Sequence, residues 1–181
     1  MSKVYTSAVV IIPPKKIWNS IQEIRRKHDP QINRWMPHIN LLYPFKSEDE
    51  FSALEARFRE VCTTIQPFTI KLEEFWFFKH RYQTYTVWLK PEPKDKIVNF
   101  QKSLLPLVPN CNDVNSFKGG YIPHLSVGKF KGTYKIKRII NSLQKDWNEI
   151  EFLLDRIFFI SREQNKSSSF TIKKEIMLKS G

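Results

Sequence analysis

Two stretches of the chain decide the fold: Trp35–Asn40 reads WMPHIN, and Tyr121–Ser126 reads YIPHLS. Both have the order aromatic, any residue, proline, histidine, apolar, polar, and the two histidines lie 86 residues apart. A short strand candidate follows each histidine, then an amphipathic helix and two further strand candidates. We interpret this shared order as an internal duplication. Two such halves are expected to pair about a pseudo-two-fold axis, which would bring their equivalent residues close together.

Hydrophobic spacing outside these stretches predicts an alternation of strands and helices. Runs rich in β-branched and aromatic residues predict strands, and apolar residues three or four positions apart predict helices. Ser47 and Glu50 predict a capping box at the start of the second helix. The expected strands are 4–12, 39–42, 68–78, 84–89, 125–130, 151–161 and 170–178, and the expected helices are 15–27, 47–65, 95–105 and 136–147.

Net charge is the strongest clue in the composition. The 181 residues include 30 Lys and Arg against 18 Asp and Glu, which leaves a formal net charge of +12. This balance favours an anionic partner: nucleic acid, a nucleotide phosphate or a membrane surface. Charge that only keeps an ordinary surface soluble is the alternative. A hydrophobic fraction of 41% and a charged fraction of 27% exclude a disordered or a fibrous chain.

Cysteine usage and the first apolar run bear on the cellular compartment. The two cysteines, Cys62 and Cys111, exclude a disulfide scaffold, and neither belongs to a CxxC pair. Cys62 falls on the apolar stripe of an expected helix, so we expect it to be buried. The run Ala8–Ile12 is too short for a signal peptide or a membrane span. We therefore expect one intracellular domain over residues 1–181, cytoplasmic or nuclear, monomeric and not bound to a membrane, with two pseudo-symmetric lobes.

The two histidines predict acid/base chemistry on a phosphodiester. In a strand, His38 shares a face with Asn40, and His124 shares a face with Ser126. If the duplication brings these faces together, one neutral imidazole can take a proton from an attacking hydroxyl or water, while the other, as imidazolium, protonates the leaving oxygen. The Ser126 hydroxyl and the Asn40 amide can donate to a non-bridging phosphate oxygen. This scheme needs no metal and no cofactor.

Simpler interpretations of these residues stay open. A lone histidine before a strand is more often structural, and a metal site lacks a third ligand at repeat-related spacing. Trp35 and Tyr121, each three residues before a histidine, are candidates for stacking on a base at the cleft rim, or for packing a loop against its own lobe. Lys129 is a further candidate for substrate contact, although strand alternation predicts that it points away from His124.

The chain also resembles a known family. HIN at 38–40 and HLS at 124–126 resemble the paired H-x-[T/S] motifs of the two-histidine phosphoesterase superfamily, which includes bacterial 2′-5′ RNA ligase-like proteins and eukaryotic cyclic phosphodiesterases. Tyr121–Phe130 is the most specific part, and Leu154–Arg162 resembles the family's penultimate strand. The resemblance implies a bilobal α+β fold in which two antiparallel sheets with flanking helices surround a central cleft. It also implies a metal-independent reaction on RNA ends or on 2′-5′ or cyclic phosphodiesters.

Motifs and resemblance together lead to one expected function and one rival. We expect a metal-independent phosphodiesterase for RNA ends, 2′,3′-cyclic phosphates or 2′-5′ linked oligonucleotides. His38 and His124 would be its acid/base pair, and Asn40 and Ser126 would bind phosphate. Asn40 stands where the family usually has Thr or Ser, which favours the rival: a non-catalytic RNA- or nucleotide-binding module that retains the cleft.

Overall fold

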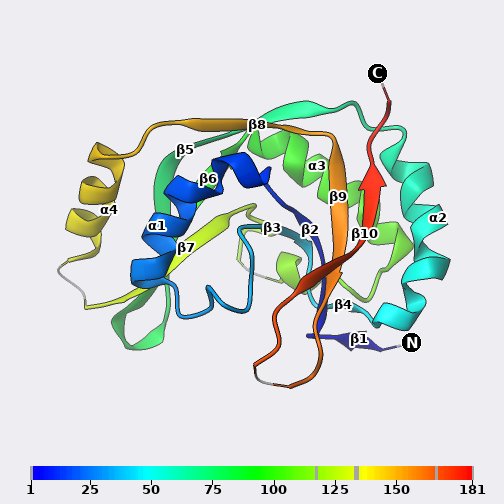
Figure 1. Ribbon diagram of the computed structural model, residues 1–181, viewed down its shortest axis with the longest axis horizontal. Coiled ribbons are helices and arrows are strands. Elements are labelled where there is room, and N and C mark those ends of the chain that lie inside the picture. Colours follow the sequence, from blue (N-terminus) through cyan, green and yellow to red (C-terminus); the bar gives the residue numbers. More distant parts are fainter. Residues whose placement is uncertain (1, 117, 133–134, 166, 181) are drawn as a thin grey trace.

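Two four-stranded antiparallel sheets form the framework of the computed structural model, which describes residues 2–116, 118–132, 135–165 and 167–180 (Figure 1). Helices flank the sheets, so the predicted α+β class is confirmed. The first sheet has the order β10-β9-β2-β3, and the second has the order β7-β6-β5-β8. The strands are β2 (Ser7–Ile11), β3 (Ile39–Leu42), β5 (Phe68–Lys79), β6 (Thr84–Glu92), β7 (Leu125–Lys131), β8 (Ile150–Leu154), β9 (Arg156–Ser161) and β10 (Thr171–Met177), with a short pair β1 (Lys3–Val4) and β4 (Phe45–Lys46) beside them.

Each histidine precedes a strand at the edge of a different sheet. β3 pairs with β2 at the edge of the first sheet, and β7 pairs with β6 at the edge of the second. Within the second sheet, β5 pairs with β8, from Phe68 opposite Leu154 to Leu72 opposite Ile150. β5 then continues beside β6, while β9 joins β2. Each sheet therefore contains strands from both parts of the chain, and the pseudo-symmetry of the two lobes stays a prediction.

One expected strand is divided in the structure. The sequence predicts a continuous strand over residues 151–161, but the chain breaks at Asp155 into β8 and β9, which belong to different sheets. The Asp155 carboxylate accepts from the Arg156 guanidinium, and its carbonyl accepts from the Leu178 amide. These contacts hold the chain at the point where it crosses between sheets.

Four α-helices are present in the described residues: α1 (Trp18–His28), α2 (Phe51–Cys62), α3 (Lys94–Leu104) and α4 (Ile136–Lys145). α1 packs on β7, α2 on β10, and α4 on β5. The close approach of α1 to β7 requires Gly128, because a Cβ there would lie 2.5 Å from the His28 Cβ. No helix among the described residues has the length and apolar character needed to cross a bilayer.

Local predictions at α2 had mixed outcomes. Cys62 is fully buried, as expected, and burial raises the pKa of its thiol to about 12. The predicted capping box is wrong, because the Ser47 side chain makes no capping hydrogen bond and a 3₁₀ turn, Glu48–Glu50, precedes the helix. In that turn Glu48 instead binds the Ser161 hydroxyl and pairs with Lys173 of β10. The turn is therefore tied to the first sheet.

Candidate active site

His38 lies immediately before β3, with both ring nitrogens engaged. Its Nδ1 is 2.7 Å from the Met36 carbonyl oxygen, so this nitrogen carries the proton and donates it. Its Nε2 is 3.2 Å from Asn40 Nδ2, and because an amide NH₂ can only donate, Nε2 is the acceptor. The contacts therefore select the neutral Nδ1–H tautomer. Nε2, the nitrogen available for proton transfer, lies on the side of Asn40.

Trp35 contacts His38 directly. The two rings are stacked, with centroids 4.4 Å apart and planes at 15°, and Trp35 also stacks on Phe170 at 3.8 Å. The indole is therefore used in packing within the protein. This arrangement differs from a free platform at the rim and matches the simpler alternative, in which the loop packs against its own surroundings.

His124 repeats the arrangement of His38 before β7. Its Nδ1 is 2.8 Å from the Ile122 carbonyl oxygen, two residues earlier, as Met36 is for His38. The His124 and Phe78 rings are perpendicular, with centroids 5.0 Å apart, and the Trp88 ring centroid lies 5.9 Å from that of the imidazole. Ser126 follows two residues on and is half-buried, and its hydroxyl has no hydrogen bond to another described residue. The Nε2 of His124 and the Ser126 hydroxyl are both available to a ligand.

A hydrogen bond joins the two motifs. The Tyr121 hydroxyl donates to the Asn40 carbonyl oxygen over 2.7 Å, and the Tyr121 side chain is only 7% exposed. The loop before His124 is thus fastened to the strand after His38. Tyr121 is buried and committed to this contact, so the expected position at the cleft rim is wrong for it. It positions the two motifs relative to each other.

Burial sets the protonation of both histidines. Desolvation lowers the pKa of His38 to about 4, with the Met36 carbonyl acting in the opposite direction and the charges of Arg25 and His124 lowering it further. Desolvation also lowers the pKa of His124, against the Ile122 carbonyl. Both imidazoles are therefore neutral near pH 7 in the unliganded protein. A phosphate anion bound between them would favour the imidazolium form.

A β-bulge changes the position of Lys129. Ser126 lies opposite Trp88 and Lys129 opposite Thr86, so Val127 is an extra residue in β7. Trp88 and Thr86 are two apart on one strand and share a face, and directly opposed residues share it too. Lys129 therefore lies on the face that carries Ser126 and Trp88. The expectation that it points away from His124 is wrong, because strict alternation ends at the bulge.

Two polar atoms beside the histidines have no partner. Among the described residues, the buried side-chain atoms without a hydrogen bond include Asn40 Oδ1, next to His38, and Trp88 Nε1, in the ring that lies against His124. A buried donor or acceptor left unsatisfied costs about 1–3 kcal/mol. Such groups in a site are candidates for contact with a ligand. No group of three or more His, Cys, Asp or Glu side chains among the described residues is placed to hold a metal ion.

Three residues of this environment were not among the sequence candidates. Trp88 and Phe78 come from the central strands of the second sheet, and only strand pairing brings them to His124. Arg25 lies on α1, thirteen positions before His38, and contacts the loop that leads to it. No local pattern marks these three, although alternation along β6 places Trp88 on the same face as Thr86.

The family is decided by a sequence model of the 2′-5′ RNA ligase superfamily, which matches residues 13–166. The chain belongs to this superfamily. Its relatives include candidate phosphoesterases from Bacillus licheniformis, 24% identical over 160 residues covering 88% of this chain and 91% of that protein, and from Geobacillus kaustophilus, 25% identical over 165 residues covering 88% and 89%. The resemblance seen in the two histidine motifs is thereby confirmed.

Solved structures agree on the fold of this superfamily member. TT0787 of Thermus thermophilus superposes with a TM-score of 0.64 at 14% identity, covering 96% of this chain and 97% of that one. Escherichia coli LigT complexed with 3′-AMP superposes with a TM-score of 0.61 at 16% identity, covering 99% and 100%. The part of the chain that the structure describes, including both histidine strands, thus has a LigT-like fold.

Proposed function

We propose that this superfamily member is a metal-independent phosphodiesterase in which His38 and His124 act as an acid/base pair. One observation carries the proposal. Each histidine donates Nδ1–H to the carbonyl two residues before it, so Nε2 is the nitrogen of each ring that can exchange a proton with substrate, and the Tyr121–Asn40 hydrogen bond ties the two motifs together. Two imidazoles in the same tautomer are suited to a reaction that needs one base and one acid.

The reaction on a 2′,3′-cyclic phosphate has two proton transfers. A neutral Nε2 accepts a proton from water as the water oxygen forms a bond to phosphorus. The bond between phosphorus and one ribose oxygen breaks, and the imidazolium of the second histidine donates its Nε2 proton to that oxygen. On a 2′-5′ linkage, the neighbouring ribose hydroxyl replaces water as the nucleophile and the 5′ oxygen leaves.

Asn40 and Ser126 are proposed to hold the phosphate. In the unliganded protein the Asn40 NH₂ donates to His38 Nε2, and on binding it can turn to donate to a non-bridging oxygen, which frees Nε2 for proton transfer. The Ser126 hydroxyl is free to donate from the other motif. Preorganised donors of this kind stabilise charge that develops on the phosphate oxygens. Escherichia coli LigT has been crystallised with 3′-AMP and with phosphate, which supports a nucleotide phosphate as the ligand class here.

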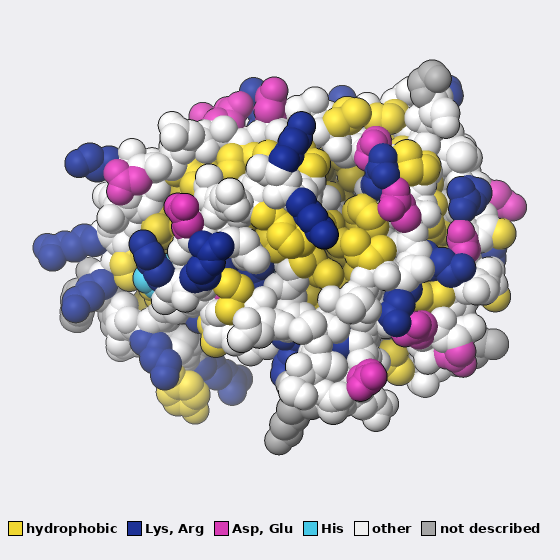
Figure 2. All heavy atoms as spheres, in the orientation of Figure 1, with side chains coloured by type: hydrophobic (Ala, Val, Ile, Leu, Met, Phe, Trp, Pro, Cys, Tyr) yellow, Lys and Arg dark blue, Asp and Glu magenta, His cyan; other side chains and the backbone are white. Residues whose placement is uncertain are grey.

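The charge distribution supports an RNA end over a free mononucleotide. Lys129 and Lys131 share the sheet face of Ser126, lie opposite Thr86 and Thr84, and are exposed. Within the described chain neither forms an ion pair. In Figure 2, lysine and arginine side chains project from the left end of the molecule, where Figure 1 places α4 and the turn between β5 and β6. Cations that continue from the site along β7 suit further phosphates of an oligonucleotide.

The rival function is a binding module without turnover. Asn40 Nδ2 occupies His38 Nε2, and burial lowers the pKa of both histidines, so neither is charged before a ligand arrives. The two functions are separated by incubating the protein in EDTA with a 2′,3′-cyclic nucleotide and with 2′-5′ and 3′-5′ linked oligonucleotides. Turnover in EDTA that His124→Ala abolishes supports the enzyme. Saturable binding without product from any substrate supports the module.

A further inference from the structure

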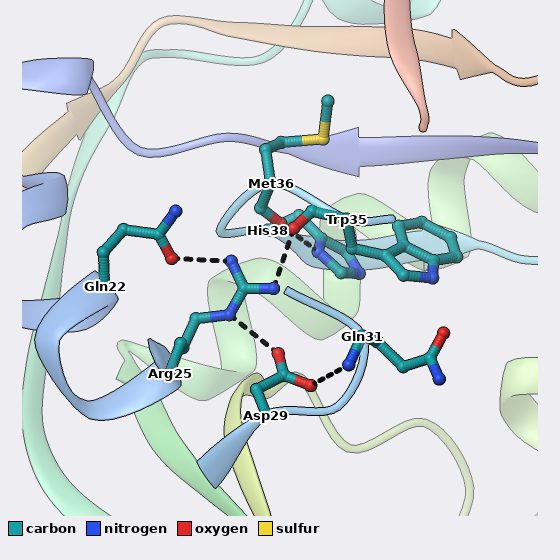
Figure 3. Close-up of polar contacts among 7 residues, drawn as sticks. All are labelled: Gln22, Arg25, Asp29, Gln31, Trp35, Met36 and His38. Carbon is teal, nitrogen blue, oxygen red and sulfur yellow. Dashed lines mark hydrogen bonds and ion pairs between the residues drawn. The ribbon is translucent and has the colours of Figure 1, made fainter. Parts of the chain in front are cut away.

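Arg25 is a buried cation outside the two histidine motifs. It lies on α1 and is only 2% exposed. Its hydrogen-bond partners lie on α1 itself and in the loop that follows it. Nε donates to Asp29 Oδ2 at 2.8 Å, Nη1 to Gln22 Oε1 at 2.9 Å, and Nη2 to the Trp35 carbonyl oxygen at 2.8 Å (Figure 3). A buried ion pair adds little stability over a well-packed apolar side chain. We therefore looked for a function of these three hydrogen bonds other than stabilising the fold.

The contacts of Arg25 fix the loop between α1 and β3. Asp29 accepts from the guanidinium with one carboxylate oxygen and from the Gln31 amide with the other, at 2.9 Å. The Gln31 carbonyl in turn accepts from the amides of Arg34 and Trp35. The guanidinium thus holds the start of the loop through Asp29 and its end through the Trp35 carbonyl.

Consecutive carbonyls connect Arg25 to the imidazole. The Trp35 carbonyl accepts from Arg25, and the next one, of Met36, accepts from His38 Nδ1 at 2.7 Å. The Trp35 ring also stacks on the imidazole. Figure 3 shows this stacking and the hydrogen bond to the Met36 carbonyl at His38. We propose that Arg25 is a positioning residue for His38, which holds the Trp35–Met36 backbone so that the imidazole keeps its Nδ1–H tautomer and presents Nε2 to the substrate. This role rests on the proposed function for its effect on turnover.

The charges near His38 predict the direction in which its pKa should change when Arg25 or Asp29 is replaced. The ionisable groups that act on His38 are Arg25 and His124, which lower its pKa, and Asp29, which raises it. Replacing Arg25 by a neutral residue removes a positive charge, so the pKa of His38 should rise. Replacing Asp29 by Asn removes a negative charge of the same cluster, so the pKa should fall. If Arg25 and Asp29 only stabilised the fold, their replacement would not shift the pKa of His38 in opposite directions.

The test compares Arg25→Gln, Arg25→Lys and Asp29→Asn with Arg59→Gln as the control. Arg59 forms an exposed i, i+4 ion pair with Glu55 on α2, away from the site. We expect Arg25→Gln to lower kcat by about 10- to 100-fold, the loss expected for a misplaced catalytic group. KM should change little. In Arg25→Gln, the part of the pH–rate profile that reports the His38 pKa should shift to higher pH. In Asp29→Asn it should shift to lower pH. Arg25→Lys should keep the wild-type pH dependence, because the positive charge remains. Its kcat should still fall, because an ammonium cannot reproduce the hydrogen bonds of the planar guanidinium.

A measurement without substrate separates this inference from the proposed function. The ¹⁵N shifts of the His38 ring report its tautomer and its pKa directly. Arg25→Gln should show a mixture of tautomers and a raised pKa, whether or not the protein turns over any phosphodiester. An Nδ1–H tautomer and pKa equal to wild type in both Arg25→Gln and Asp29→Asn would overturn the proposal. If Arg25→Gln does not fold, the downward shift in Asp29→Asn alone decides it.

Discussion

Asn40 donates to Nε2 of His38, the nitrogen that the proposed reaction uses. At the scale of single residues, its role is therefore tied to both the histidine and the phosphate. Its amide oxygen, Oδ1, is buried without a partner, so a turn of the amide would let Asn40 accept from an imidazolium. One side chain can thus follow either protonation state of His38. The Asn40 NH₂ also has two hydrogens to donate, whereas the hydroxyl of the Thr or Ser usual at this position has one.

Substitutions at Asn40 should reveal this double contact. Asn40→Ala should lower kcat/KM by an amount equivalent to about 2–4 kcal/mol, the range for one preorganised donor. Asn40→Asp should be worse than Ala at neutral pH, because it places a negative charge against the phosphate. That defect should ease as the pH falls through the carboxylate pKa. Asn148→Asp, an exposed position after α4, is the control, and wild-type activity in Asn40→Asp would exclude contact with phosphate.

The lowered pKa values predict an acidic optimum. The proposed acid must be an imidazolium, and that form is lost as the pH rises through the pKa of the folded protein. Both pKa values lie below the ordinary 6.5, with His38 at about 4. The profile of kcat/KM, which reports the free enzyme, should therefore be bell-shaped with its maximum below about pH 6.5. The kcat profile should lie at higher pH, because bound phosphate stabilises the imidazolium. A kcat/KM that keeps rising to about pH 8 would contradict this assignment.

Candidate site residues could be predicted from the sequence only where the motif itself carried them. His38, Asn40, His124 and Ser126 follow from the repeated pattern, and the structure joins the two motifs through Tyr121. The face of Lys129 was mispredicted, because the bulge at Val127 depends on pairing with β6. Trp88 and Arg25 reach the histidines only through tertiary packing, which no local pattern encodes.

At the scale of elements, β7 joins the second histidine to the helix that packs on it. Gly128 lies in this strand against His28 at the end of α1, so strand and helix are in contact through backbone and Cβ atoms. The same strand carries Ser126 and the bulge. α1 also carries Arg25. The position of α1 against β7 therefore affects both motifs at once.

Gly128→Ala should disturb this contact. The new Cβ would lie 2.5 Å from the His28 Cβ and 3.1 Å from its carbonyl oxygen, so α1 must move. We expect a loss of about 1–3 kcal/mol in the free energy of unfolding, typical of overpacking, measured by urea denaturation. His28→Gly removes one of the clashing atoms, and the double variant should recover part of the loss. Stability equal to wild type in Gly128→Ala would show that the helix and strand are not held at this distance.

Element positions were predicted better than their partners. Hydrophobic spacing located β3 residue for residue, and placed α1, α3 and α4 to within a few residues. The break at Asp155 was missed, because the apolar alternation continues through it and only the exchange between sheets interrupts the strand. The capping box at Ser47 failed because Glu48 binds Ser161 and Lys173 of the first sheet. Long-range pairing decided each of these departures.

At the scale of the whole molecule, the effect of the net charge of +12 on a ligand depends on where the lysine and arginine side chains lie. Lys129 and Lys131 stand on the histidine face, and other cations surround that end of the molecule (Figure 2). Composition alone predicted an anionic partner but not this placement. The two-lobed division was likewise inferred from the repeat and stays a prediction, because each observed sheet contains strands from both parts of the chain.

Substrate length and salt should reveal the contribution of these cations. Lys129→Ala combined with Lys131→Ala should lower kcat/KM for an oligonucleotide far more than for a 2′,3′-cyclic mononucleotide. The slope of log kcat/KM against log salt should become shallower by about one to two, since each phosphate of a single strand that a cation neutralises contributes about 0.7. Lys179→Ala, which follows β10, is the matched control. Equal losses for long and short substrates would contradict an RNA track along β7.

The most direct test of the two-histidine mechanism is a double-mutant cycle at His38 and His124, measured in EDTA. The substrate is the cyclic or 2′-5′ phosphodiester that wild type turns over. Each single His→Ala variant should lose about 10²–10⁴-fold in kcat/KM, the usual contribution of a general acid or base. The double variant should lose far less than the product of the two, because both groups act on one transition state. Full activity in His124→Ala, or two losses that simply multiply, would contradict the assignment.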